Sequence, residues 1–189
     1  MTQKRAEVWH YTYTLWEDFT KTHPDDSRGY YNLGYLYYKN YLIPEDQMPP
    51  GETKEKNRQF AMQFFREAVA RDFSNKKAHL NLGNCFYREN KFVEALPHFQ
   101  NAAKADSTYE LAYFNLGNVH YMLQDYPSSI QNYLKAIEVK PSYLNAYTQL
   151  GATYQNIGDE AKSIEYYQKA ARRGSEQAQQ ILQAKGVEY

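Results

Sequence analysis

The chain has 189 residues, with 22 Lys and Arg, 22 Asp and Glu, and a single cysteine. This length allows one compact domain or one short repeat array. The zero net charge gives no pull towards nucleic acid or an anionic membrane, Cys85 alone cannot form an intrachain disulfide, and no run of about eighteen apolar residues could span a bilayer.

The N-terminal stretch, residues 4–22, predicts a helix, because apolar residues including Trp9 and Trp16 recur at helical spacing. A helix rarely continues through the residue before a proline, so Pro24 ends it. Pro24 also stands in phase with Pro141 once a later insertion is removed. Residues 1–26 are therefore predicted to be the second helix of a half repeat.

Residues 27–75 are predicted to form a first complete helical hairpin with a Pro-rich insertion at about 41–57. Three prolines and a glycine forbid regular helix there. One interpretation is a tolerated surface loop. The other is that Tyr41, Leu42, Ile43 and Met48 fold back onto the helices and form a partner site.

The rest of the chain repeats itself. Gly83, Gly117 and Gly151 follow one another at intervals of 34 residues, and Gly34 lies one interval plus 15 residues before Gly83. A period of this size predicts stacked helical hairpins. The predicted units are residues 76–109, 110–143 and 144–177, and residues 178–189 are predicted to be a capping helix and tail.

A fixed pattern surrounds each glycine. A leucine precedes it directly, an aromatic or histidine stands four before and three after, and the second helix carries an aromatic ring and, three residues later, an alanine. Small residues let two helices approach closely while the rings fill the space beside them. This pattern resembles the tetratricopeptide repeat. The resemblance implies an all-α fold, a right-handed α-solenoid of helix-turn-helix hairpins.

The resemblance also implies a concave groove lined by the first helix of each hairpin. It would bind an extended peptide or a partner helix without catalysing a reaction. The groove residues carried over onto this sequence are Asn32, Tyr35, Tyr38, Asn81, Asn84, Tyr87, Arg88, Asn115, Asn118, Tyr121 and Gln149.

Two series within that groove have alternative interpretations. The amides two before each glycine can pair with a peptide backbone, or they can cap and bridge helices. The tyrosines four after the glycine can anchor a ligand, or they can serve only helix packing. The amide series is Asn32, Asn81, Asn115 and Gln149, and the tyrosine series is Tyr38, Tyr87 and Tyr121.

The sequence lacks the residues that several specific functions require. The family's clamp for a C-terminal carboxylate needs cations where Leu80 and Gln149 stand, so a chaperone-tail receptor is not expected. No histidines have metal-ligand spacing, and no phosphate loop or serine elbow occurs, so the sequence predicts no catalytic residues, no metal and no cofactor. Cys85 is expected to be a buried filler and not a nucleophile.

The beginning of the chain gives a second, weaker resemblance. Trp9, Leu15-Trp16-Glu17-Asp18 and Pro24 are similar to the junction that leads into the tetratricopeptide tail of multi-span, glycosyltransferase-like membrane proteins. That resemblance implies a substrate-recruiting tail outside the cytoplasm, whereas a true start at Met1 implies a cytoplasmic protein. A third hypothesis is a homo-oligomer that assembles through end faces carrying Trp9 and Trp16. The expected partner is in each case a protein or peptide, with no nucleic acid and no membrane insertion by this chain.

Overall fold

The computed structural model describes the backbone of residues 3–48 and 51–189 and the side chains of residues 11–44, 46–48 and 51–189. Every regular element in that part of the chain is a helix, and none of these helices combines the length and apolarity needed to cross a bilayer. The chain divides into two compact units, Met1–Lys91 (unit 1) and Phe92–Tyr189 (unit 2).

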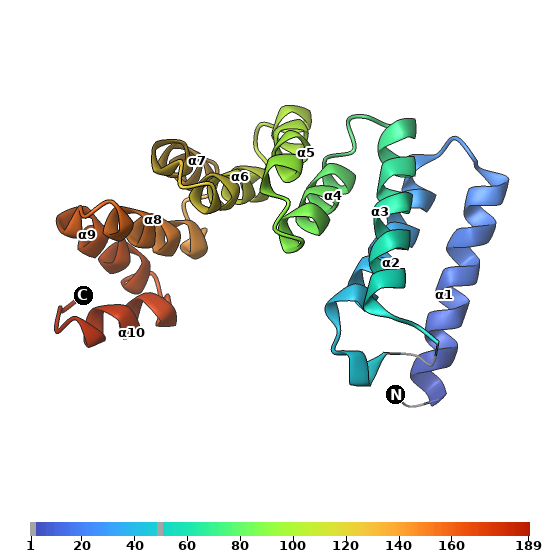
Figure 1. The fold of residues 1–189 in the computed structure, drawn as a ribbon, viewed down its shortest axis with the longest axis horizontal. Coiled ribbons are helices and arrows are strands. Elements are labelled where there is room, and N and C mark those ends of the chain that lie inside the picture. The colour runs from blue at the N-terminus through green and yellow to red at the C-terminus, as the bar shows by residue number, and fades with distance from the viewer. Residues whose placement is uncertain (1–2, 49–50) are drawn as a thin grey trace. The chain divides into compact units, whose positions relative to one another are not determined.

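Unit 1 is built around α2, which packs against α1, α3 and α4 (Figure 1). Helices α2, α3 and α4 are each preceded by a capping residue. Its side-chain oxygen accepts a hydrogen bond from a backbone N–H of the first turn, at 2.8–3.1 Å. Such caps stabilise a helix by about 1 kcal/mol. The helices are α1 (Gln3–Thr22), α2 (Ser27–Leu42, capped by Asp26), α3 (Lys54–Arg71, capped by Thr53) and α4 (Lys76–Arg88, capped by Asn75).

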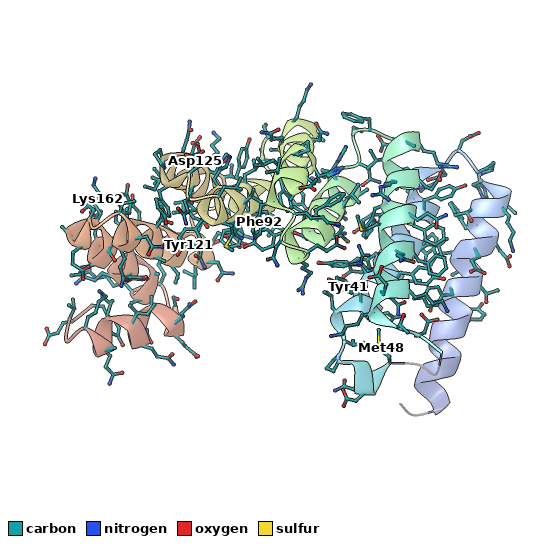
Figure 2. The ribbon with its side chains drawn as sticks, viewed as in Figure 1. Tyr41, Met48, Phe92, Tyr121, Asp125 and Lys162 are labelled. Carbon is teal, nitrogen blue, oxygen red and sulfur yellow. The ribbon has the colours of Figure 1, made fainter. Side chains whose placement is uncertain are left out.

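The insertion interrupts the helices over a shorter stretch than the sequence indicated. Regular α-helix continues to Leu42 and resumes at Lys54, with one short 3-10 turn, Glu45–Gln47, between them. Tyr41 packs against the core of unit 1, and Met48 is half-buried, whereas Leu42 is 42% exposed (Figure 2). The segment is thus partly packed against the hairpin; residues 49–50 lie outside the described residues.

Unit 2 is a succession of helices in which each packs against the next (Figure 1). The turns that join the paired helices carry a residue with positive φ, Gln124 at 60° and Gly158 at 79°. Asn90 of unit 1 has φ 59° at the same repeat position. The helices are α5 (Phe92–Ala105), α6 (Glu110–Met122), α7 (Tyr126–Val139), α8 (Leu144–Asn156), α9 (Glu160–Ala171) and α10 (Glu176–Ala184).

Within a hairpin, the repeat glycine meets the aromatic ring of the second helix. A Cβ atom added to Gly117 would lie 2.5 Å from the ring of Tyr133, and one added to Gly151 would lie 2.7 Å from Tyr167. In unit 1 a Cβ atom on Gly34 would lie 2.8 Å from Phe65. These three rings are almost completely buried. The predicted pairing of a small residue with a ring is confirmed in the α2–α3, α6–α7 and α8–α9 hairpins.

The end of unit 2 is covered by α10, as expected of the last helix of a repeat array. Ala178 and Leu182 are 0% exposed and join a cluster with Tyr147, Tyr167 and Ala170. Without α10 this cluster would face water.

Candidate peptide-binding face of unit 1

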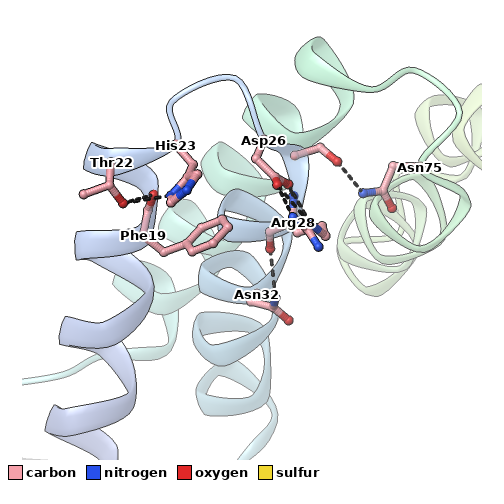
Figure 3. A network of polar contacts seen from close by, with 8 residues as sticks. Phe19, Thr22, His23, Asp26, Arg28, Asn32 and Asn75 are labelled. Atoms are coloured by element: carbon pink, nitrogen blue, oxygen red, sulfur yellow. Dashed lines mark hydrogen bonds and ion pairs between the residues drawn. The ribbon is translucent and has the colours of Figure 1, made fainter.

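The first helices of unit 1, α2 and α4, are joined by one hydrogen bond at their starts and by two polar side-chain interactions further along. Asn75 donates to Ser27 at 3.4 Å beside the start of both helices (Figure 3). Further along, the side chain of Asn81 interacts with the hydroxyl of Tyr31. The guanidinium group of Arg88 interacts with the hydroxyl of Tyr38 near the other end. The two helices therefore present one continuous face.

The first of two pockets on this face, the C-end pocket, has a volume of about 480 Å³. It lies near the last turns of both helices. Four of its five lining residues are groove residues predicted from the sequence. The lining residues are Tyr38, Asn84, Tyr87, Arg88 and Asn90.

The N-end pocket, of about 350 Å³, lies at the beginning of α2 and α4. Its walls combine three aromatic rings with two amides and two cations. Only Asn32 and Trp16 among them were predicted as site residues. The lining residues are Trp16, Phe19, Arg28, Tyr31, Asn32, Asn75 and Lys77.

Trp16 therefore contributes to the same face as the groove residues, although the sequence placed it on a separate end face. Its ring packs edge-on against Phe19 at 5.6 Å between centroids. The large hydrophobic residues exposed on the described part of α1 are instead Tyr11, 73% exposed, and Leu15, 53% exposed. The side chain of Trp9 lies outside the described residues.

The amide series is used partly within the protein. Asn32 donates to the carbonyl of Arg28 in its own helix at 2.9 Å (Figure 3), and Asn81, 8% exposed, interacts with the side chain of Tyr31. Asn115 and Gln149 of unit 2 are half-buried. One bond uses only part of an amide's donor and acceptor capacity. Binding of a peptide backbone by these amides stays a prediction.

The predicted tyrosines of unit 1 differ in how exposed their rings are. Tyr38 is 7% exposed and belongs to the core of unit 1, so burial raises the pKa of its hydroxyl, against the opposing effect of the Arg88 guanidinium group. Tyr87 is half-buried and lines the C-end pocket. Tyr35 is 40% exposed, stacks on Tyr31 at 6.1 Å and lies under the ammonium group of Lys39.

Two of the predicted residues of unit 2, Asn118 and Tyr121, form hydrogen bonds between helices. The hydroxyl of Tyr133 donates to Asn118 at 2.7 Å, which ties α7 to α6. Tyr121, on α6 (Figure 2), accepts a hydrogen bond from Asn156 of α8. A pocket of about 480 Å³ in this unit is lined by residues of α6 and α7 that were not predicted, including Tyr113 and Lys135.

The two pockets of the α2–α4 face are lined by aromatic rings, amides and cations. The described residues contain no group of three or more His, Cys, Asp or Glu side chains placed to hold a metal ion. Cys85 is 0% exposed in the core of unit 1, as predicted, and burial raises the pKa of its thiol to about 12. At neutral pH the thiolate that a nucleophile requires is therefore scarce.

Sequence reasoning missed Arg28 and Lys77. Both stand six residues before a repeat glycine, at Gly34 and Gly83, one turn ahead of the first predicted position. Their equal offset from the glycine was the available signal.

Comparisons with known proteins agree with the helical architecture. Models described as "TPR repeat" match residues 83–124 and 123–158, and one described as "Tetratricopeptide repeat" matches residues 144–173. A comparison with curated proteins gives no significant match.

Solved structures with a similar fold include MamA and YrrB. A MamA crystal structure has a TM-score of 0.74 and 21% identity, over 94% of this chain and 95% of that chain. MamA from residue 41 onwards, from Desulfovibrio magneticus RS-1, has a TM-score of 0.72 and 15% identity, over 89% and 87% of the two chains. YrrB, a TPR protein, has a TM-score of 0.72 and 17% identity, over 97% and 87%. The chain therefore carries tetratricopeptide repeats over residues 83–173 and has the all-helical solenoid fold that its sequence predicted.

Proposed function

We propose that this protein is a non-catalytic interaction module that holds an extended peptide of a partner protein on the α2–α4 face of unit 1. The observation that carries the proposal is the C-end pocket. Asn84, Tyr87 and Arg88 reach it from successive turns of α4, and Tyr38 reaches it from α2. Rigid rings and a guanidinium group are the residue types enriched at the centres of protein interfaces.

The fold adds support from a relative. The solved structure of YrrB is described as a TPR protein with an unusual peptide-binding site. A shared fold does not transfer a ligand, since one fold hosts many functions. It does make a peptide the first class of ligand to test.

Selection from a random dodecapeptide library on the full-length chain tests the proposal. Selected peptides are labelled, and their affinity is measured by fluorescence anisotropy. Tyr87→Ala should weaken them roughly tenfold, because an interface anchor contributes about 1–2 kcal/mol. Tyr113→Ala is the matched control, a half-buried tyrosine that lines a pocket of unit 2. Failure to select any peptide, or equal binding by Tyr87→Ala, would rule the proposal out.

Self-association is the second candidate function, favoured by the exposed Tyr11 and Leu15 one turn apart on α1. Exposed apolar residues grouped on one helix mark association surfaces. Light scattering should then show a mass that rises with concentration for the wild type and stays monomeric for Tyr11→Glu/Leu15→Glu. A monomer at every concentration would exclude it.

A further inference from the structure

The α2–α4 face carries a cation at each end of each helix. Positions six and two before the repeat glycine, and one and five after it, lie within about 60° on one side of a helix that turns 100° per residue. These positions make one stripe on each helix. The stripe of α2 is Arg28, Asn32, Tyr35 and Lys39, and that of α4 is Lys77, Asn81, Asn84 and Arg88.

The repeat fold does not require these charges. At the same end positions, α6 has Leu111 and Met122, and α8 has Asn145 and Asn156. Neither stripe of unit 1 contains an acidic residue, and no acidic residue lines the N-end pocket or the C-end pocket. The cations are therefore a property of this face alone among the four first helices.

Among the described residues, only one of the four cations, Arg28, is paired with a carboxylate. Arg28 is paired with Asp26 at 2.9 Å (Figure 3), and the ammonium group of Lys39 lies 5.7 Å from the centre of the Tyr35 ring. Lys77 and Arg88 form no ion pair with any described residue. The carboxylate next to Arg88, Glu89, is already bound by Arg58 and Lys91.

Each pocket thus contains one uncompensated cation. Lys77 lies in the N-end pocket and Arg88 in the C-end pocket, both exposed and both on the same side of α4. Eleven residues separate them, which at 1.5 Å per residue is about 16 Å. Two anions are needed to satisfy charges that far apart, so a single terminal carboxylate cannot do so.

We infer that unit 1 binds an extended acidic peptide that places one Asp or Glu side chain in each pocket. This inference rests on the proposed function and specifies its partner. An extended chain rises about 3.3 Å per residue, so two carboxylates four to six residues apart span the two pockets. Asn81 and Asn84 lie between the cations, beside the path of the peptide backbone. The rings of Trp16 and Tyr87 supply apolar contacts at either end.

The test uses labelled dodecapeptides, acetylated and amidated, built from Ser, Ala and Tyr with two glutamates separated by two to eight positions. Anisotropy with the full-length chain should show an optimum at separations of four to six. Replacing both glutamates by glutamine should weaken binding at least tenfold. Lys77→Glu and Arg88→Glu should each weaken it by about fivefold or more, the size of one partly exposed ion pair. Arg66→Glu, an exposed cation of α3 that lines neither pocket, is the matched control and should change affinity less than twofold.

Three outcomes would overturn the inference: affinity that is independent of glutamate spacing, an equal loss in Arg66→Glu, or binding that requires a free C-terminal carboxylate. The first two would indicate attraction by overall charge. If library-selected peptides bind through Tyr87 but lack paired acidic residues and tolerate Lys77→Glu, the acidic partner is wrong and the proposed function stands. If neither selected nor designed peptides bind, both are wrong.

Discussion

Replacement of Gly117 by alanine should destabilise the α6–α7 hairpin. The added Cβ atom would lie 2.5 Å from Cδ1 and Cε1 of Tyr133, whereas carbon atoms in contact are normally about 3.5–4.0 Å apart. Tyr133 is 0% exposed, and its hydroxyl is held by Asn118 at 2.7 Å. The ring therefore has to move by about 1 Å against packed neighbours and a hydrogen bond.

The size of the effect follows from three contributions. Overpacking of a core costs about 1–3 kcal/mol. Loss of the Tyr133–Asn118 hydrogen bond costs about 1 kcal/mol more, and the better helix propensity of alanine returns about 1 kcal/mol. The free energy of unfolding should fall by roughly 1–3 kcal/mol, measured by urea denaturation followed by circular dichroism.

A double-mutant cycle with Tyr133→Leu separates this clash from a general loss of helix. The smaller side chain leaves room for the Cβ atom, so Gly117→Ala should cost markedly less in the Tyr133→Leu background. Additive effects, or a neutral Gly117→Ala variant, would refute the reasoning.

Three other variants or conditions probe separate features. Gln124→Gly should raise the free energy of unfolding by about 0.5–1 kcal/mol, because glycine tolerates the φ of 60° that strains glutamine; a loss of stability would contradict this. Cys85 should react with a thiol reagent such as DTNB only after denaturation, since burial raises its pKa to about 12, and rapid modification of the native protein would disprove it. Acid should destabilise the protein through helix caps whose carboxyl pKa values are lowered by hydrogen bonds to the ionised form, that of Asp26 to about 2. This stability is complete above the ordinary pKa of about 4 and is lost as the pH falls towards 2. Thermal melts between pH 6 and pH 2 should show the loss, and a variant with asparagine at all three caps should show less of it; equal losses would argue against the caps. The caps are Asp26, Asp125 and Asp159.

The hairpins could be predicted because their determinants are local and recur. Gly117 and Tyr133 stand 16 residues apart, as do Gly151 and Tyr167, so one spacing fixes the helix pair. The first and last residues of the insertion could be predicted less accurately from the sequence. Prolines indicate where a helix is forbidden, but the start of α3 is set by the cap at Thr53, whose role depends on local geometry.

The sequence predicted which side of each helix carries the candidate site, but not how deeply each of its residues is buried. Repeat spacing gives the side of the helix on which Tyr38 and Asn81 lie, whereas their burial depends on how closely α4 approaches α2. Trp16 shows the same limit. Its helical position was clear, but its place in the N-end pocket depends on the packing of α1 beside α2.

Under the proposed function, folding and recognition use different residues of unit 1. The hairpin is held by Gly34 against the fully buried ring of Phe65, whereas Arg28, Lys39, Lys77 and Arg88 are all exposed. Surface substitutions of this kind usually change stability by no more than about 0.5 kcal/mol. Substitution of these four residues, by natural drift or by design, could therefore change which partner is recognised while the hairpin stays intact.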